Sequence, residues 1–178
     1  MKKIYKKNNK RIGILGGTFD PPHAGHLYIS KIAIKKLNLD KLIWIITKQN
    51  PFKKQPSLSI EKRIKLSKQK TKKQKKIFIR FIERKIKSKN TFDLLSYLKK
   101  KNKKNILFFL IGADNLIKFH KWKKWKKIPD LAKIVVFARS NYISKALSSI
   151  ASKSLKKKDW MYINCKKISI SSSLIRKF

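Results

Sequence analysis

The chain has 178 residues, of which 42% are apolar and 11% aromatic, and its formal net charge is +41 at pH 7. This length suits one domain with a sizeable core, and the apolar content excludes a disordered tail. The single cysteine, Cys165, excludes a disulfide framework and a cysteine-rich zinc site, and it suits a reducing cytoplasm. The apolar run that begins at Ile106 is too short to span a bilayer, and the basic N-terminus lacks an apolar signal core. We therefore expect a soluble cytoplasmic protein that has no membrane partner.

The positive charge has two interpretations. Dense lysine and arginine attract phosphate backbones, which would favour a nucleic-acid-binding protein. Of the 49 basic residues, however, only 6 are arginine, the residue of bidentate phosphate and base recognition. The lysines are also scattered along the whole chain, and isoleucine is far commoner than alanine, a bias typical of AT-rich genomes. Codon drift is therefore the favoured explanation, and specific binding of nucleic acid is not expected.

Strand-like and helix-like segments alternate along the chain. Short runs rich in β-branched and aromatic residues predict strands, and most are apolar throughout, which is typical of a parallel sheet covered on both faces. These runs occupy residues 11–17, 41–47, 77–83, 106–112, 133–139 and 160–164. Helices are predicted between them, over residues 26–39, 59–70, 91–101, 115–126 and 143–153, with a final turn or two from Ser171.

This alternation predicts the fold class. About six strand and helix units, with no internal repeat and no linker rich in proline or glycine, indicate one doubly wound, Rossmann-like α/β domain with a mainly parallel sheet. The domain is expected over residues 11–178, after a basic tail over residues 1–10 that we expect to be frayed. The sequence leaves the oligomeric state open.

The segment GGTFDPPHAGH, residues 16–26, follows the first predicted strand. In a doubly wound fold the first strand-to-helix turn is the favoured phosphate site. Gly16 and Gly17 let the backbone approach a ligand closely, while His23 and His26 fall at a helix N-terminus whose N–H groups favour an anion. The pattern matches neither a P-loop nor a glycine-rich dinucleotide fingerprint. Histidines on a surface or at a cap would be the ordinary interpretation, but two of the three histidines of the chain lie in this expected crevice.

Four segments carry a family resemblance. The segment from Gly16 to His26 resembles the first signature of the nucleotidylyltransferase superfamily, whose H-x-G-H element matches His23 to His26. ISSSLIR at residues 170–176 resembles the second signature, I-S-S-T-x-I-R, with Ser173 in place of threonine. IGADNLIKFHKWKKW from residue 111 and TKQNPFKK from residue 47 are similar to the bacterial nicotinate-nucleotide adenylyltransferases. The resemblance covers almost the whole chain.

The resemblance implies an enzyme that transfers the adenylyl group of ATP to nicotinate mononucleotide, giving nicotinate adenine dinucleotide and pyrophosphate in NAD biosynthesis. The residues agree with this chemistry. Transfer between phosphates depends on positioning and on neutralising charge, and these segments offer hydrogen-bond donors. Mg²⁺ is expected to arrive on ATP, because the eight acidic residues are scattered and predict no metal cage.

The resemblance also implies roles for individual residues. His23 and His26 are the expected catalytic residues, with His26 stabilising the transition state. The expected ATP-binding residues are Gly16, Gly17, Thr18, Phe19, His23, His26, Gly112, Asp114, Ser172, Ser173 and Arg176. The expected nicotinate mononucleotide-binding residues are Gly17, Thr18, Lys53, Thr91 and Trp122, and the indole of Trp122 would stack on the pyridine ring.

Several positions depart from the pattern or keep two interpretations. Asp114 matches an acid near the ATP ribose, and it could also cap a helix. Trp125 is more typical of core packing, and His120 has no predicted role. Asn90 stands where the family commonly has tyrosine, so a contact made by that ring is not carried over to this chain, although Thr91 can still cap the helix and donate to the substrate.

Three alternatives remain open. Phosphopantetheine and nicotinamide-nucleotide adenylyltransferases share both signatures, but they are not expected to carry GADNLIKFHKW. A lysine-rich nucleic-acid-binding protein would explain the charge and would leave the signatures as coincidence. A degenerate, inactive relative would keep the fold without the activity.

Overall fold

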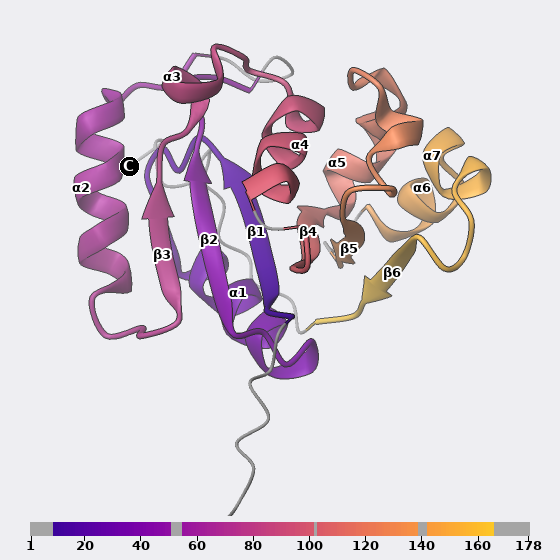
Figure 1. The fold of residues 1–178 in the computed structure, drawn as a ribbon, viewed down its shortest axis with the longest axis horizontal. Coiled ribbons are helices and arrows are strands. Elements are labelled where there is room, and N and C mark those ends of the chain that lie inside the picture. The colour runs from indigo at the N-terminus through magenta and orange to yellow at the C-terminus, as the bar shows by residue number, and fades with distance from the viewer. Residues whose placement is uncertain (1–8, 51–54, 102, 139–141, 166–178) are drawn as a thin grey trace, which may run out of the picture.

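The computed structural model describes residues 9–50, 55–101, 103–138 and 142–165. Within these residues six strands form one sheet in the order β3-β2-β1-β4-β5-β6, and every neighbouring pair is parallel (Figure 1). The strands are β1 (Arg11–Gly17), β2 (Lys41–Ile46), β3 (Ile77–Arg80), β4 (Ile106–Gly112), β5 (Lys133–Phe137) and β6 (Trp160–Ile163). This order confirms the predicted doubly wound α/β fold, in which the winding reverses between β1 and β4.

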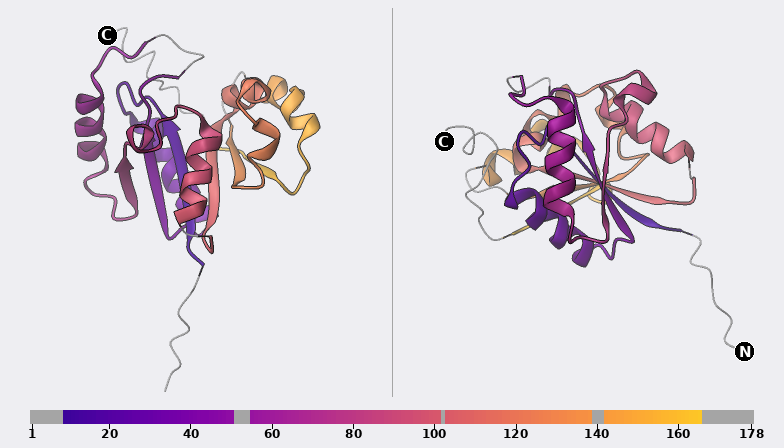
Figure 2. Two further views of the ribbon diagram at one scale, coloured as in Figure 1. Left: turned by 45° about the horizontal axis from the view of Figure 1, so that its top comes forward. Right: turned by 90° about the vertical axis from the view of Figure 1, so that its left-hand side faces the viewer.

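Helices cover both faces of the sheet (Figure 2). One face carries α1 (Ala24–Lys36) and α2 (Ile60–Thr71), and the other carries α4 (Thr91–Lys101), α5 (Ala113–Lys118), α6 (Ile143–Leu147) and α7 (Ile150–Ser154). The remaining described elements are the short helix α3 (Glu83–Ile86) and two 3₁₀ turns, η1 (Phe119–Lys121) and η2 (Trp125–Lys127). Because both faces are covered, the strands are apolar almost throughout, as their sequences indicated.

Each face of the sheet has its own apolar core. Leu15 and Trp44 are buried on the side of α1 and α2. Ile14 is buried on the opposite side, together with Leu95 of α4 and Leu116 of α5. Ile14 and Leu15 are neighbours in β1 and enter different cores, because successive side chains of a strand point to opposite faces.

The helix predicted over residues 115–126 is interrupted. Regular helix ends at Lys118, and η1 and η2 follow as separate turns. Lys124 lies between them with a φ of 51°, in the left-handed region, so the helix cannot continue through it. Trp122 therefore lies between the two turns and Trp125 begins the second one, where the sequence predicted one continuous helix.

The helix predicted over residues 143–153 is split into α6 and α7. The break lies at Ser148 and Ser149. The Ser149 hydroxyl accepts a hydrogen bond from the Ser152 backbone N–H at 3.3 Å and so caps α7. Serine side chains compete with helical backbone bonds in this way, which is why they favour helix ends over helix interiors.

The ends of the chain are only partly described. Lys10 leads into β1, and its carbonyl accepts a hydrogen bond from Ile106 N at 2.9 Å. Residues 1–8 of the predicted tail, and the turn predicted from Ser171, lie outside the described residues. The domain boundary near residue 11 stays a prediction. No helix in the described part of the chain is long and apolar enough to cross a bilayer.

Arg63, near the start of α2, is a buried charge with 3% of its surface exposed. Its guanidinium donates to the carbonyl oxygens of Thr18 at 2.7 Å, Thr47 at 2.6 Å, Leu58 at 3.0 Å and Lys48 at 3.2 Å. Thr18 follows β1, Thr47 and Lys48 follow β2, and Leu58 precedes α2. One side chain therefore joins three segments at the carboxyl edge of the sheet.

Asp20 reinforces this junction from the loop after β1. Its carboxylate is 1% exposed and accepts hydrogen bonds from Ser57 N at 2.8 Å and Leu58 N at 3.0 Å. Burial lowers the pKa of the Arg63 guanidinium, and the negative charge of Asp20 opposes that effect. A buried charge that is both paired and fully hydrogen-bonded is tolerated, whereas removing one partner leaves the other uncompensated.

We predict that Arg63→Ala lowers the free energy of unfolding by about 3 kcal/mol or more, because it removes the donor from four backbone carbonyls and leaves the buried Asp20 without its counter-charge. Urea unfolding followed by circular dichroism measures the change. Arg84→Ala removes an exposed arginine of α3 and serves as the matched control, with an expected effect within about 0.5 kcal/mol. Equal stability of the two variants would contradict the structural role of Arg63.

Candidate active site

The loops after β1 and β4 meet at the carboxyl edge of the sheet. Leu15 of β1 pairs with Leu110 of β4, so Gly17 and Gly112 both stand two residues beyond this pair. From β1 the strands β2 and β3 follow in one direction across the sheet, and from β4 the strands β5 and β6 follow in the other. In open parallel sheets the ligand crevice lies where the direction reverses in this way. The structure thus brings together the glycine and histidine segment after β1 and the acidic segment after β4, which are far apart in sequence.

Gly16 leaves open space at the end of β1. A Cβ built on Gly16 would meet no atom within 4 Å, whereas one on Gly17 would lie 3.4 Å from the Phe19 ring. Gly16 is also exposed and does not have a positive φ. Its backbone conformation therefore suits any residue, and the space above it is what a close-approaching ligand requires.

His23 and His26 lie at the start of α1. His23 occupies the N-cap position with φ −135° and ψ 173°, and His26 lies in the first turn. The His23 backbone N–H donates to His26 Nδ1 at 3.2 Å, and the ring centroids are 3.8 Å apart. Because Nδ1 accepts this bond, the proton of a neutral His26 ring is on Nε2, which is then a hydrogen-bond donor.

The ring of His26 rests on an aromatic floor. Phe19, which is 1% exposed, lies 4.6 Å from His26 and stacks on Trp44 at 4.7 Å between centroids. Trp44 Nε1 donates to Ser30 Oγ at 2.8 Å, and Ser30 Oγ donates to the His26 carbonyl at 2.6 Å. Sequence analysis predicted no site role for Trp44 or Ser30, because each is an ordinary residue of a predicted strand or helix.

Asp114 follows β4 in the first turn of α5. The N-cap of α5 is Gly112, so the alternative that Asp114 caps this helix is wrong. A Cβ at position 112 would lie 2.5 Å from Asp114 Oδ1, which is closer than real Cβ atoms approach any atom. The carboxylate therefore lies against the end of β4, and glycine at position 112 is what allows this approach.

The start of α4 contributes Thr91. Thr91 is the first residue of the helix, and the Asn90 carbonyl accepts the Leu94 N–H at 3.1 Å. The cap position thus belongs to Asn90, and the expectation that Thr91 caps the helix is wrong. The first-turn N–H groups nevertheless follow Thr91 directly and favour a negative group beside them.

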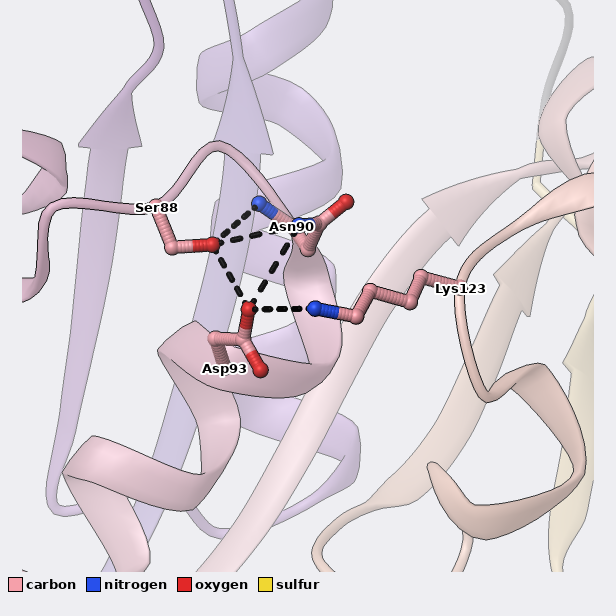
Figure 3. A network of polar contacts seen from close by, with 4 residues as sticks. All are labelled: Ser88, Asn90, Asp93 and Lys123. Atoms are coloured by element: carbon pink, nitrogen blue, oxygen red, sulfur yellow. Dashed lines mark hydrogen bonds and ion pairs between the residues drawn. The ribbon is translucent and has the colours of Figure 1, made fainter.

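Asn90, Ser88 and Lys123 surround the carboxylate of Asp93 in α4 (Figure 3). Asp93 Oδ2 accepts from Ser88 Oγ at 2.7 Å, from Asn90 Nδ2 at 3.4 Å and from Lys123 Nζ at 3.4 Å. The Ser88 hydrogen bond is the main cause that lowers the pKa of Asp93. Asn90, which replaces the tyrosine usual in the resembled family, is thus part of a polar network.

Trp122 lies in the segment between η1 and η2. Its ring packs 5.1 Å from Phe119 and 6.0 Å from Phe109, and it is partly buried. Its Nε1 is buried and has no hydrogen-bond partner among the described residues. Trp125 lies edge-on to Phe119 at 6.3 Å and packs against the same core, which confirms the packing interpretation of Trp125.

Glu83 is a second acidic residue for which sequence analysis predicted no role. Its Oε2 accepts a hydrogen bond from Lys48 N at 3.1 Å, in the segment that Arg63 also contacts. Burial is the main cause that raises the pKa of the Glu83 carboxyl, against the effect of the Lys48 hydrogen bond. The loops at this edge are therefore held together by three charged side chains, those of Arg63, Asp20 and Glu83. The one sequence signal for these contacts was the presence of an arginine at position 63 in a chain whose basic residues are mostly lysine.

Some expected site residues are not placed. Lys53, Ser172, Ser173 and Arg176 lie outside the described residues. Among the described residues no group of three or more His, Cys, Asp or Glu side chains is arranged to hold a metal ion. The Nδ1 atom of His120 is buried, and it has no hydrogen-bond partner among the residues that the structure describes.

Comparison with known sequences places this chain. The family model described as cytidylyltransferase-like matches residues 14–178. A protein of Pelagibacter ubique (strain HTCC1062), named probable nicotinate-nucleotide adenylyltransferase, is 49% identical over 167 residues that cover 94% of this chain and 92% of the relative. A protein of the same name from Ruegeria sp. (strain TM1040) is 39% identical over 141 residues, which cover 79% of this chain and 74% of the relative.

Solved structures agree in fold. The nicotinic acid mononucleotide adenylyltransferase of Plasmodium falciparum complexed with NaAD aligns with a TM-score of 0.71 at 23% identity, over 96% of this chain and 84% of that one. Its complex with APC aligns with a TM-score of 0.72 at 24% identity, with the same coverage. The chain therefore belongs to the cytidylyltransferase-like family and, within it, to the nicotinate-nucleotide adenylyltransferases.

Proposed function

We propose that the chain transfers the adenylyl group of ATP to nicotinate mononucleotide, giving nicotinate adenine dinucleotide and pyrophosphate, as a step of NAD biosynthesis. The observation that carries the proposal is that the segment at the end of β1 and the segment after β4 lie at the same crevice. The open Gly16 backbone lies at the end of β1, the histidine pair follows this strand, and Asp114 follows the neighbouring strand β4. Relatives that are 49% and 39% identical to this chain carry the name probable nicotinate-nucleotide adenylyltransferase, which supports the same assignment.

The reaction needs positioning more than covalent help. A phosphate oxygen of nicotinate mononucleotide attacks the α-phosphorus of ATP, the bond to the bridging oxygen breaks, and pyrophosphate leaves. Charge builds up on the phosphate oxygens, and fixed donors lower the barrier by stabilising that charge. His26 Nε2 and the ring of His23, at the positive end of α1, are the donors we assign to this role.

The ATP side of the proposal uses both loops. Gly16, Gly17 and Thr18 would meet phosphates through their backbones, and Phe19 would contribute through its backbone because its ring is in the core. Asp114 would accept hydrogen bonds from the ribose hydroxyls, beside Gly112. Ser172, Ser173 and Arg176 are proposed as phosphate contacts from the family signature. ATP would enter as its Mg²⁺ complex, with the metal held by the phosphates.

The pyridine-nucleotide side uses α4 and the segment after η1. Trp122 would stack on the nicotinate ring, and its Nε1 is buried without a hydrogen-bond partner among the described residues. Thr91 and the first N–H groups of α4 would receive the carboxylate, and Gly17, Thr18 and Lys53 would contact the phosphate. A cytoplasmic location belongs to the same proposal, because Cys165 is the single cysteine of the chain.

A pyrophosphate-release assay tests the function. Purified protein with ATP, Mg²⁺ and nicotinate mononucleotide is expected to release pyrophosphate and form the dinucleotide, with neither substrate sufficient alone. Phosphopantetheine as acceptor tests the nearest alternative within the superfamily. A gel shift at physiological salt tests the nucleic-acid alternative, which tight binding without adenylyl transfer would favour.

We predict that His26→Ala lowers turnover by about 10²- to 10³-fold, the scale for losing one preorganised donor at a transition state. His26→Asn retains a polar group near the Nδ1 position and lacks the Nε2 donor, so it should be as slow as the alanine variant. His26→Gln can reach the Nε2 position and should recover part of the rate. Steady-state kinetics with matching circular dichroism spectra checks the series, and an alanine variant within twofold of wild type refutes the role.

For Trp122→Ala we predict a higher KM for nicotinate mononucleotide with little change in the KM for ATP. The stacking contact acts on one substrate and contributes roughly 0.5–1.5 kcal/mol, which corresponds to about a two- to tenfold change. Trp125→Ala is the matched control on the neighbouring turn, where the side chain packs on Phe119. If both substrates weaken equally in Trp122→Ala, the indole acts as core packing instead.

The enzyme is also predicted to prefer the nicotinate over the nicotinamide nucleotide. A carboxylate only accepts hydrogen bonds, whereas the NH₂ of a carboxamide would face the donors at the start of α4 and leave them unpaired. Such a mismatch costs roughly 1–3 kcal/mol per buried group, or about ten- to hundredfold in catalytic efficiency. Efficiencies on both nucleotides at low and high salt decide the point. Equal efficiencies exclude the pocket, and a preference that disappears in salt assigns it to the general positive field.

A further inference from the structure

Two adjacent lysines after Trp122 contact two adjacent residues in the first turn of α4. Lys123 Nζ lies 3.4 Å from Asp93 Oδ2. Lys124 Nζ lies 5.1 Å from the centroid of the Phe92 ring, in a cation–π arrangement. Both contacts join the same two segments, which are about 30 residues apart in sequence.

The backbone couples these lysines to the position of Trp122. Trp122 itself is extended, with ψ 146°, and Lys124 is left-handed, with φ 51°. Trp125 N donates to the Trp122 carbonyl at 3.2 Å and closes the segment into a compact turn. Because Lys123 is the next residue after Trp122, a displacement of its backbone also displaces the indole.

Asp93 is already fixed from its own side. Ser88 Oγ at 2.7 Å and Asn90 Nδ2 at 3.4 Å both donate to the oxygen that receives Lys123 (Figure 3). Ser88 Oγ is fixed in turn by the Asn90 backbone N–H at 3.2 Å. The carboxylate is thus a preorganised receptor at the start of α4, and Lys123 is the group that reaches it from the Trp122 segment.

We propose that the Lys123–Asp93 ion pair clamps the Trp122 segment to the start of α4 and thereby sets the position of Trp122 relative to Thr91. The inference rests on the proposed function, in which these two residues receive the pyridine nucleotide. Lys123, Asp93, Ser88 and Asn90 are positioning residues, because they act through Trp122 and Thr91.

The exposure of the pair sets the size of the effect. The side chains are 51% exposed for Lys123 and 30% exposed for Asp93. Ion pairs this accessible contribute little, so we expect a change of about two- to fivefold when one partner is removed. Such a change is too small to disturb the fold, and it should appear in the KM for nicotinate mononucleotide rather than in kcat or in the KM for ATP.

Kinetics of Lys123→Gln at low ionic strength tests the clamp. We expect the KM for nicotinate mononucleotide to rise about two- to fivefold, with kcat, the KM for ATP and the melting temperature unchanged. Lys123→Arg keeps the charge and should restore the wild-type value. Lys127→Gln is the matched control, because it also removes one exposed lysine from the same region. Lys127 lies in η2, three residues after Lys124. Asp93→Asn should match Lys123→Gln, and the double variant should be no worse than either single variant.

A second readout keeps the clamp testable if the proposed activity fails. Amide hydrogen exchange of residues 119–127 should be about two- to fivefold faster in Lys123→Gln than in wild type, and unchanged in Lys127→Gln. A wild-type protein that transfers no adenylyl group would refute the proposed function, and exchange would then decide on the clamp alone. Equal behaviour of the Lys123 and Lys127 variants in both readouts overturns the clamp.

Discussion

The carboxyl edge of the sheet is organised around the buried guanidinium of Arg63. Loops at this edge expose backbone carbonyls, and carbonyls that leave water must find donors. Arg63 supplies donors to four of them, from the segments after β1, after β2 and before α2. A lysine could not replace it, because a single ammonium lacks the planar fork that reaches several acceptors at once.

This junction fixes the place where the proposed chemistry occurs. Thr18, whose carbonyl accepts a hydrogen bond from Arg63, follows Gly16, which has open space beside it, and Gly17, and it is followed by Phe19. Phe19 in turn contacts the ring of His26 and stacks on Trp44, and the His26 and Trp44 ring centroids are themselves 5.8 Å apart, so the three rings form one compact cluster. Transfer between phosphates depends on fixed donors rather than on a reactive side chain, so a rigid floor under the histidines is what the reaction requires.

Much of the fold was predictable, because short strand-like runs that are apolar throughout and alternate with helical segments are typical of a parallel sheet covered on both faces. β1, β4 and α4 match their predicted ranges residue for residue. The breaks were not predictable, since the left-handed Lys124 and the capping Ser149 carry no signal distinct from their neighbours. At the site, the H-x-G-H pattern indicated both histidines. Arg63 and Asp20 were missed because their function depends on tertiary contacts between segments that only the fold brings together.

At Asn90 the sequence predicted the loss of a contact, and the structure shows which contacts are present instead. The sequence indicated that a tyrosine contact would not carry over, and it could not say what replaced it. In the structure the Asn90 carbonyl takes the cap position of α4, and its amide joins the Ser88 and Asp93 network. The helix start is therefore ordered by polar contacts, next to the segment that carries Trp122.

A crystal structure of the protein with nicotinate adenine dinucleotide is the decisive test of the proposed site, since this product has one part for each half of the site. We expect the dinucleotide to span the crevice between β1 and β4. Its phosphates should lie within hydrogen-bond distance of His23 or His26, its pyridine ring against Trp122, and its adenosine ribose beside Asp114. A dinucleotide bound away from this crevice, or with its two halves exchanged, would refute the proposed site.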